Sequence, residues 1–201
     1  MYSFFKTFLA FLFVLAGHSG FTQRVYAAHS VLSNGNWVKI SVSASGIYKM
    51  DAAFLSGLGL GTNLSSAQLR IFGNGGSLLP ESNIQRADDL QEVSISVIDG
   101  GDGVINGNDY ILFYATGPHQ WKWDSVSKKF THQKNIYSDK SYYYISAGGV
   151  GKRIATQTVV PPSGTLITAF DERWYHELDS INFLLSGKEW FGEEFSSNPG
   201  H

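Results

Sequence analysis

The chain has 201 residues, 43% of them hydrophobic and 16% charged, a composition typical of a globular domain and not of a disordered chain. Its formal net charge of −2 excludes the strongly basic surface that nucleic-acid binding requires. Because the chain contains no cysteine, it has no disulfide, thiolate metal site or cysteine nucleophile. Its 22 glycines lie between short apolar runs and aromatic residues make up 14% of the chain, which together favour β-strands joined by tight turns.

The N-terminal residues have the pattern of an export signal. Lys6 precedes an apolar run over residues 8–16, which is long enough for a signal-peptide core but too short for a membrane span. Ala27 and Ala28 provide the small side chains that signal peptidase requires, so we predict a signal peptide over residues 1–28 with cleavage after Ala27 or Ala28. An uncleaved anchor is the alternative. The mature chain is predicted to contain no transmembrane span.

The first elements after the signal are predicted from apolar periodicity. Residues 37–42 alternate apolar and polar side chains, as do residues 47–50, and the small residues between them predict a β-hairpin. Asp51 is an N-cap for a short helix over residues 52–58.

The rest of the mature chain is predicted to be mainly β. Further strands are expected at residues 68–72, 92–98, 109–116, 141–146 and 165–175, and a second short helix at residues 179–185. Many short strands of this kind favour an antiparallel β-sandwich-like domain with one or two short helices, which we place over residues 29–201.

Residues 102–109 resemble the second half of a calcium-binding loop. Asp102, Asn106 and Asp109 provide oxygen ligands at spacings that suit calcium. The first half of such a loop is missing, because an apolar side chain and a glycine stand where two ligands belong. Two interpretations remain open, namely a calcium site formed by these three residues and a tight turn between two strands. No other cofactor is predicted.

Two tryptophans are candidates for binding a partner. Trp121 and Trp123 follow a Gly-Pro turn and suit a sugar or a protein surface, although aromatic residues also cover the ends of sheets. No catalytic group is marked, since there is no Gly-x-Ser-x-Gly motif, and His176-Glu177 is followed by Ser180 where a zinc-protease helix needs a second histidine.

Several separate motifs follow one another through most of the chain. They are Asn36-Trp37-Val38-Lys39-Ile40, Gly46-Ile47-Tyr48-Lys49-Met50, Arg70-Ile71-Phe72-Gly73-Asn74-Gly75-Gly76, Leu79-Pro80-Glu81, Asp88-Asp89-Leu90-Gln91-Glu92, Asp109-Tyr110-Ile111-Leu112-Phe113-Tyr114, Gly117-Pro118, Asn135-Ile136-Tyr137-Ser138-Asp139, Tyr142-Tyr143-Tyr144, His176-Glu177, Ser186-Gly187-Lys188-Glu189-Trp190 and Gly192-Glu193. In this order they resemble the N-terminal region of the gingipain-like sortases of the type IX secretion system of Bacteroidetes.

The resemblance implies a protein of the cell envelope, exposed at the outer-membrane surface. Its parent would be a cysteine endopeptidase that removes the C-terminal sorting domains of secreted cargo and helps attach the cargo to anionic lipopolysaccharide, beside outer-membrane partners such as PorV. In that family a Cys/His pair in a downstream caspase-like domain performs the reaction.

Because these 201 residues contain no cysteine, no catalytic residue is carried over. We expect residues 29–201 to be an accessory domain, truncated before the peptidase domain that it packs against. The competing hypothesis is an independent exported β-domain that binds a sugar or a protein partner through Trp121 and Trp123.

Overall fold

The computed structural model describes residues 24–159, 164, 168–169, 173–185 and 189–193. Two compact units are distinguished along the chain, the first up to residue 122 together with 133–155, and the second formed by residues 123–132 and those from 156 onward. The two main sheets belong to the first unit.

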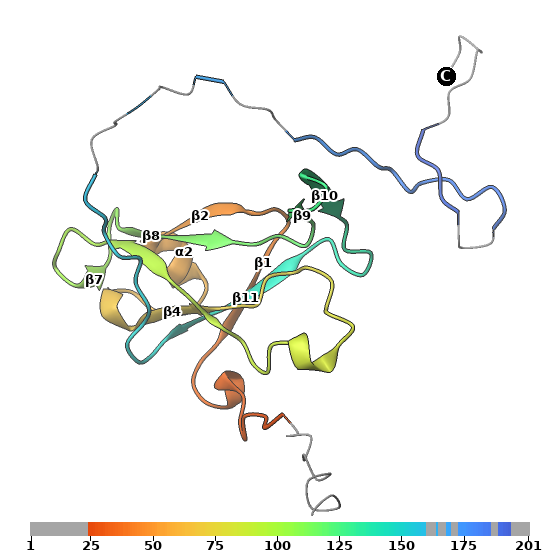
Figure 1. Ribbon diagram of the computed structural model, residues 1–201. Coiled ribbons are helices and arrows are strands. Elements are labelled where there is room, and N and C mark those ends of the chain that lie inside the picture. The colour runs from red at the N-terminus through yellow and green to blue at the C-terminus, as the bar shows by residue number, and fades with distance from the viewer. Residues whose placement is uncertain (1–23, 160–163, 165–167, 170–172, 186–188, 194–201) are drawn as a thin grey trace, which may run out of the picture. The chain divides into compact units, whose positions relative to one another are not determined.

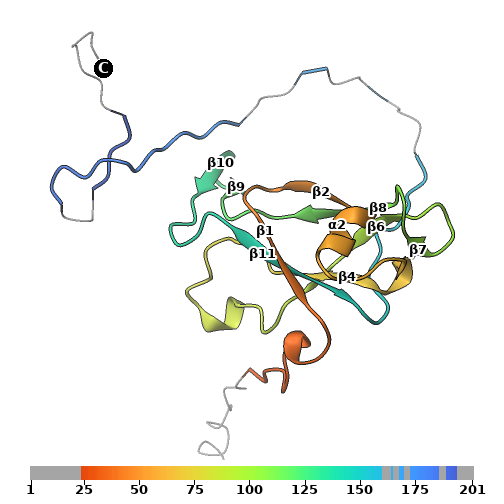
Figure 2. The ribbon, with the colours of Figure 1, turned by 180° about the vertical axis from the view of Figure 1, so that it is seen from behind.

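The first unit contains a four-stranded and a three-stranded antiparallel sheet (Figures 1 and 2). The four-stranded sheet has the order β1 (Val38–Val42), β11 (Ser141–Ala147), β4 (Leu69–Phe72) and β5 (Glu92–Val93). The three-stranded sheet has the order β2 (Gly46–Asp51), β8 (Tyr110–Ala115) and β6 (Ile95–Ile98).

Shorter elements complete the described chain. Two further pairs of strands are β3 (Leu64–Ser65) with β7 (Val104–Ile105) and β9 (Gln120–Asp124) with β10 (Lys129–Gln133). The helical elements are the α-helix α2 (Ala52–Gly57) and the 3-10 turns η1 (Val31–Ser33), η2 (Ser66–Gln68) and η3 (Asn83–Gln85). The predicted fold class, a mainly β, sandwich-like antiparallel domain with little helix, is confirmed.

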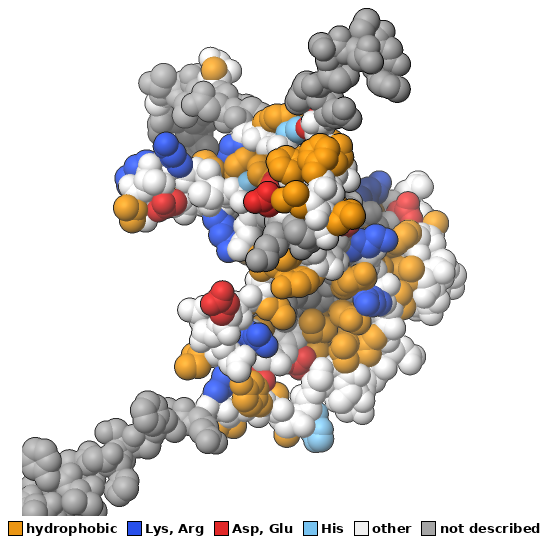
Figure 3. All heavy atoms as spheres, turned by 90° about the vertical axis from the view of Figure 1, so that its right-hand side faces the viewer, with side chains coloured by type: hydrophobic (Ala, Val, Ile, Leu, Met, Phe, Trp, Pro, Cys, Tyr) orange, Lys and Arg blue, Asp and Glu red, His pale blue; other side chains and the backbone are white. Residues whose placement is uncertain are grey.

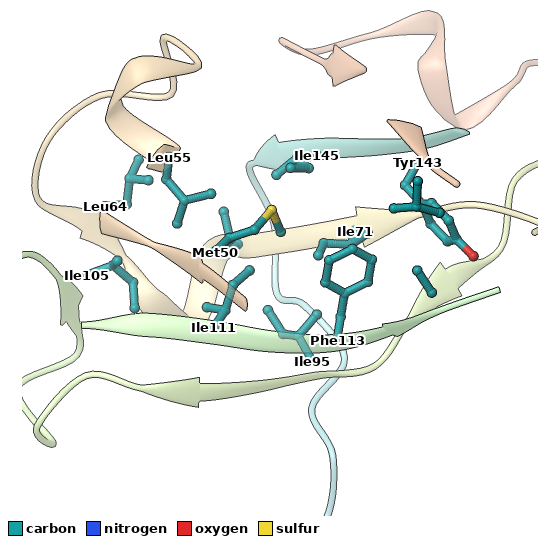
Figure 4. Close-up of a cluster of buried hydrophobic side chains, with 13 residues drawn as sticks. Met50, Leu55, Leu64, Ile71, Ile95, Ile105, Ile111, Phe113, Tyr143 and Ile145 are labelled. Carbon is teal, nitrogen blue, oxygen red and sulfur yellow. The ribbon is translucent and has the colours of Figure 1, made fainter. Parts of the chain in front are cut away.

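The core lies between the two sheets and follows from the alternation of side chains along their strands. Ile71, Tyr143 and Ile145 of one sheet point toward Ile111 and Phe113 of the other (Figure 4). All five are at most 2% exposed. Burial of this apolar surface is the main force that holds the sheets face to face.

The side chains of Tyr143 and Asp51 make polar contacts at the boundary of the core. The hydroxyl of Tyr143 accepts a hydrogen bond from the Thr116 N–H at 2.6 Å and donates one to the Thr116 carbonyl at 3.1 Å, so this buried oxygen is satisfied. Asp51 accepts the Phe54 N–H at 2.8 Å, which confirms it as the N-cap of α2, and the helix then buries Leu55 completely.

The strand pairing differs from the prediction at two places. β1 and β2 form where expected, but they do not make a hairpin, because β1 pairs with β11 and β2 pairs with β8. The strand predicted over residues 92–98 is interrupted at Ser94, and its two halves join different sheets as β5 and β6. In both cases a short segment carries the chain from one sheet to the other, so that both strands bury an apolar face in the same core.

Neither the strand nor the helix predicted near the C-terminal end is found in the described residues. Residues 179–185 form no helix, and Ile181 instead makes an isolated antiparallel bridge with Phe191. Part of the strand predicted over residues 165–175 lies outside the described residues, and the described part is not a strand.

The segment that follows β11, residues 148–154, binds both sheets. Arg153 donates to the carbonyls of Ser66 at 2.5 Å and Leu69 at 3.2 Å, beside the four-stranded sheet. Along β6, the Ile95 N–H donates to the Lys152 carbonyl at 3.2 Å and the Ile154 N–H donates to the Ile95 carbonyl at 2.9 Å. We call residues 148–154 the return segment, because it fastens the end of the last core strand to the edge of the opposite sheet.

The carboxylate of Glu92 joins the return segment to β4. It accepts the Lys152 N–H at 2.7 Å and pairs with the guanidinium of Arg70 at 3.0 Å. Burial alone raises the pKa of Glu92, but the hydrogen bonds from Arg70 and Lys152, together with the positive charges of both side chains, outweigh burial and hold the pKa below its usual value.

Gly117 is a position where only glycine fits. A Cβ atom there would lie 2.6 Å from the carbonyl carbon of Ala44 and 2.7 Å from the nitrogen of Ser45, and backbone atoms cannot move aside as a flexible side chain can. We expect Gly117→Ala to lower the free energy of unfolding by about 1–3 kcal/mol, measured by urea denaturation. Gly46→Ala is the matched control, because a Cβ atom on Gly46 meets nothing within 4 Å. Equal stability of the two variants would contradict the packing described here.

The Glu92 pairing predicts a pH dependence with a definite sign. Because the pKa of Glu92 is lowered by folding, its contribution to stability is complete above the unfolded-state pKa, near 4.5, and is lost as the pH falls through the folded-state pKa. We expect Glu92→Gln to destabilise the protein by about 1–3 kcal/mol at neutral pH. This difference should shrink toward zero below about pH 4. Urea titrations of both proteins across this range measure it, and a pH-independent difference would rule out an ionised Glu92 as the cause.

Candidate functional site

The predicted calcium loop is a tight connection between strands. Carboxylate oxygens of this loop accept hydrogen bonds from backbone N–H groups of the same loop. Asp102 accepts the Val104 N–H at 2.9 Å, and Asp109 accepts the Asn106 N–H at 3.0 Å. The same loop carries positive φ at Gly103 and Gly107, which glycine adopts without strain. The loop connects β6 to β8 by way of β7.

The three candidate ligands of calcium therefore lie in one loop, and both carboxylates, of Asp102 and Asp109, already accept a hydrogen bond through one oxygen. Among the described residues no group of three or more His, Cys, Asp or Glu side chains is arranged to hold a metal. Calcium binding by Asp102, Asn106 and Asp109 stays a prediction, and the melting temperature with and without added calcium is the measurement that tests it.

A groove lies between this loop and α2. It has a volume of about 360 Å³, and its lining includes Ser56, Thr62, Asn63 and Asn106, with no charged side chain. Its chemistry suits a small uncharged polar group, but nothing among its residues indicates a reaction.

The two candidate tryptophans lie on β9 and are exposed. Trp121 is 36% and Trp123 is 52% exposed. The ring of Trp123 lies 4.9 Å from that of Phe130 on β10, and the guanidinium of Arg173 lies 4.1 Å from the Phe130 ring. This arrangement provides aromatic surface with a positive charge at its border. Hydrophobic side chains also reach the surface on the face of the molecule shown in Figure 3.

A second exposed apolar surface lies on the outward face of the three-stranded sheet. Ile47 on β2 and Tyr114 on β8 are directly opposite each other in the register and are 74% and 56% exposed. On the same face, the ammonium of Lys49 lies 4.3 Å from the ring of Tyr110. β2 is an edge strand of its sheet in the described part of the chain.

The predicted cleavage residues belong to the first unit, and their segment contacts the loop between β4 and β5. The Ala27 N–H donates to the carboxylate of Asp88 at 2.6 Å, across 61 positions of the sequence. Ala27 and Ala28 are both exposed. Cleavage after either of them stays a prediction.

The hydrogen bonds described for His119 and His176 involve groups other than serine hydroxyls. His176 contacts the carboxylate of Glu193, and this hydrogen bond lowers the pKa of Glu193. The nearby Ser180 hydroxyl donates to the Gly192 carbonyl at 2.7 Å and not to an imidazole. In the first unit, His119 accepts the Asn135 N–H at 3.0 Å. These contacts are structural.

Sequence reasoning overlooked the polar residues that fasten the first unit together. Arg24, Asp89, Glu92 and Arg153 each bond to backbone groups far away in the sequence. Asp89 and Glu92 lie in one of the motifs listed above, but the motif does not show their partners, which are carbonyl and N–H groups that every residue has. Within the described residues, no helix has the length and apolar character needed to cross a membrane.

No protein-family model matches the chain, and no curated protein matches it. Among solved structures, the chain is similar to dimeric latent PorU from Porphyromonas gingivalis, with 31% sequence identity and a TM-score of 0.56. The similarity covers 77% of this chain, and the chain spans 13% of the length of the PorU chain. The chain therefore has a PorU-like fold.

Proposed function

We propose that this chain is the N-terminal accessory domain of a gingipain-like sortase of the type IX secretion system. The observation that carries the proposal is the similarity to PorU, because 31% identity over 77% of the chain accompanies the same fold. The motif order identified in the sequence supports the same family. In this proposal the domain performs no catalysis, and the parent protein is a cysteine endopeptidase that cleaves the C-terminal sorting domains of cargo and attaches the cargo to the cell surface.

The chemistry of the chain agrees with an accessory role. A peptidase of this class needs a thiolate activated by an imidazole, and the chain contains no cysteine. The proposed location is the outer-membrane surface, which the protein reaches by export. The proposed partners are the downstream peptidase domain and outer-membrane proteins such as PorV. The similarity to PorU supports a cell-surface location.

The outward face of the three-stranded sheet is the surface we propose for the peptidase domain. Ile47 and Tyr114 are large, adjacent and exposed, and β2 presents the edge of its sheet beside them. Exposed apolar side chains next to an edge strand are a common feature of interfaces.

The genetic test is to read the transcript through the codon of His201. We expect an open reading frame that leads within a few hundred residues, on the order of two domains, to a caspase-like domain with a histidine and a cysteine nucleophile. A stop codon at this point would contradict the sortase proposal and would leave an exported binding domain.

The proposed interface predicts a difference between this chain and its parent. We expect Ile47→Ser combined with Tyr114→Ser to change the melting temperature of this chain by less than about 2 °C, because both side chains are already exposed. In the parent, the same substitutions should expose the linkers around the domain to limited proteolysis. Lys39→Ser with Tyr142→Ser, on the outward face of the other sheet, is the matched control. Unchanged proteolysis of the parent would exclude this face as the interface.

The second candidate function is binding of a sugar or protein through Trp121 and Trp123, favoured by the aromatic pair Trp123–Phe130 at the surface. Saturable binding of this chain to one of a panel of defined oligosaccharides, reduced at least tenfold by Trp123→Ala, would support it. Absence of binding to the whole panel would remove the sugar form of this hypothesis.

A further inference from the structure

The first residues of the described chain are fastened to the loop between β4 and β5. The guanidinium nitrogen Nη1 of Arg24 lies 3.1 Å from the carbonyl oxygens of both Asn83 and Ile84, and 2.5 Å from that of Arg86. These carbonyls belong to η3 and to the residue that follows it. Hydrogen bonds from a charged donor are stronger than those between neutral groups, so Arg24 is an anchor for the chain that precedes β1.

Two carboxylates of the same loop hold the residues that follow Arg24. Asp88 accepts the Ala27 N–H at 2.6 Å. Asp89 accepts the Val31 N–H at 2.5 Å and the Ser30 hydroxyl at 2.9 Å. The hydrogen bond from Val31 is the largest of the contacts that lower the pKa of Asp89. Contacts thus lie on both sides of the peptide bond between Ala27 and Ala28, and we call residues 24–31 the N-terminal strap.

The loop that receives the strap is itself fixed to the core. The Asn74 amide donates to the Asp89 carbonyl at 3.1 Å, and its oxygen accepts the Gln91 N–H at 2.9 Å. The Gly73 N–H, directly after β4, donates to the Gln91 carbonyl at 2.9 Å. The loop that binds the strap is therefore held by hydrogen bonds to the residues directly after β4.

A cut after Ala27 would remove Arg24 and the Ala27 N–H, and it would leave the η3 carbonyls and Asp88 without these donors. A cut before Arg24 keeps every contact of the strap. The sequence allows such a cut, because Gly17 and Ser19 place small residues at the spacing that signal peptidase requires, and they follow the apolar run over residues 8–16 more closely than Ala27 does.

We propose that the N-terminal strap is part of the mature protein, that export processing cuts the chain before Arg24, and that Arg24 is the residue that anchors the strap. This inference rests on the export included in the proposed function. Cleavage after Ala27 or Ala28 is the competing outcome.

The first test is the N-terminal sequence and intact mass of the exported protein, produced from the complete precursor. We expect a first residue at or before Arg24. A chain that begins at Ala28 or His29 would overturn the proposal while leaving export intact. An exported chain that keeps residue 1 would also overturn the proposal and would indicate an uncleaved anchor. None of these results bears on the sortase assignment, which the transcript decides.

The second test examines Arg24 as the anchor. In the exported protein, Arg24→Ala should speed amide hydrogen exchange of residues 27–31 and 83–90 by about tenfold, because the strap loses its charged donor. Val25→Ala is the matched control from the same strap, since Val25 is 92% exposed. Arg24→Lys should give an intermediate rate. Exchange in Arg24→Ala equal to that of the control would overturn the role of Arg24 even if the strap is retained.

Discussion

One carboxylate joins three segments of the first unit, namely its own strand β5, the strand β4 and the return segment. Glu92 lies on β5, takes the guanidinium of Arg70 from β4 and accepts the Lys152 N–H from the return segment. The charge of Glu92 is mostly removed from water, since its side chain is 10% exposed, and such a charge is tolerable only when its oxygens are paired. Because Ser94 then carries the chain to the other sheet, the same short region contributes to both sheets and to the attachment of the return segment.

The close approach of chain segments is the second constraint, and it requires glycine at a few positions around the core. At Gly117 the chain passes directly over the backbone of Ala44 and Ser45, and the Gly117 N–H donates to the Ser45 hydroxyl at 2.9 Å. At Gly73 an added Cβ atom would collide with the ring of Tyr143, whose hydroxyl holds Thr116. The two sheets are thus joined at one end by contacts that leave no room for a side chain.

Much of the local structure could be predicted from the sequence, because alternation and capping act over a few residues. β1, β2, β8, β11 and α2 were predicted within about two residues of their observed ends, the usual limit of boundary assignment. The pairing of β1 and β2 could not be predicted, since alternation identifies the buried face of a strand but not its neighbour. The anchoring contacts of Arg24 with the Arg86 carbonyl and of Glu92 with the Lys152 N–H were equally hidden, because these partners lie about 60 positions away and are backbone groups. At the candidate site, the sequence located the loop of Asp102 and Asp109 and the exposed Trp123, and the structure added their hydrogen-bond partners.

On the proposed function, the domain contributes to a peptidase by position, and two anchored segments of the first unit agree with this role. The return segment bonds to both sheets at the end of the first unit, and Arg153 and Glu92 provide part of these contacts. The N-terminal strap is fixed in the same way through Asp88 and Asp89 on the loop that leads into β5. Both anchors converge on β5 and the residues before it, so a change there alters the two places where the core is joined to the rest of the polypeptide. On the proposed function, the β4–β5 region is therefore the part of the domain whose stability would affect the polypeptide that follows the domain.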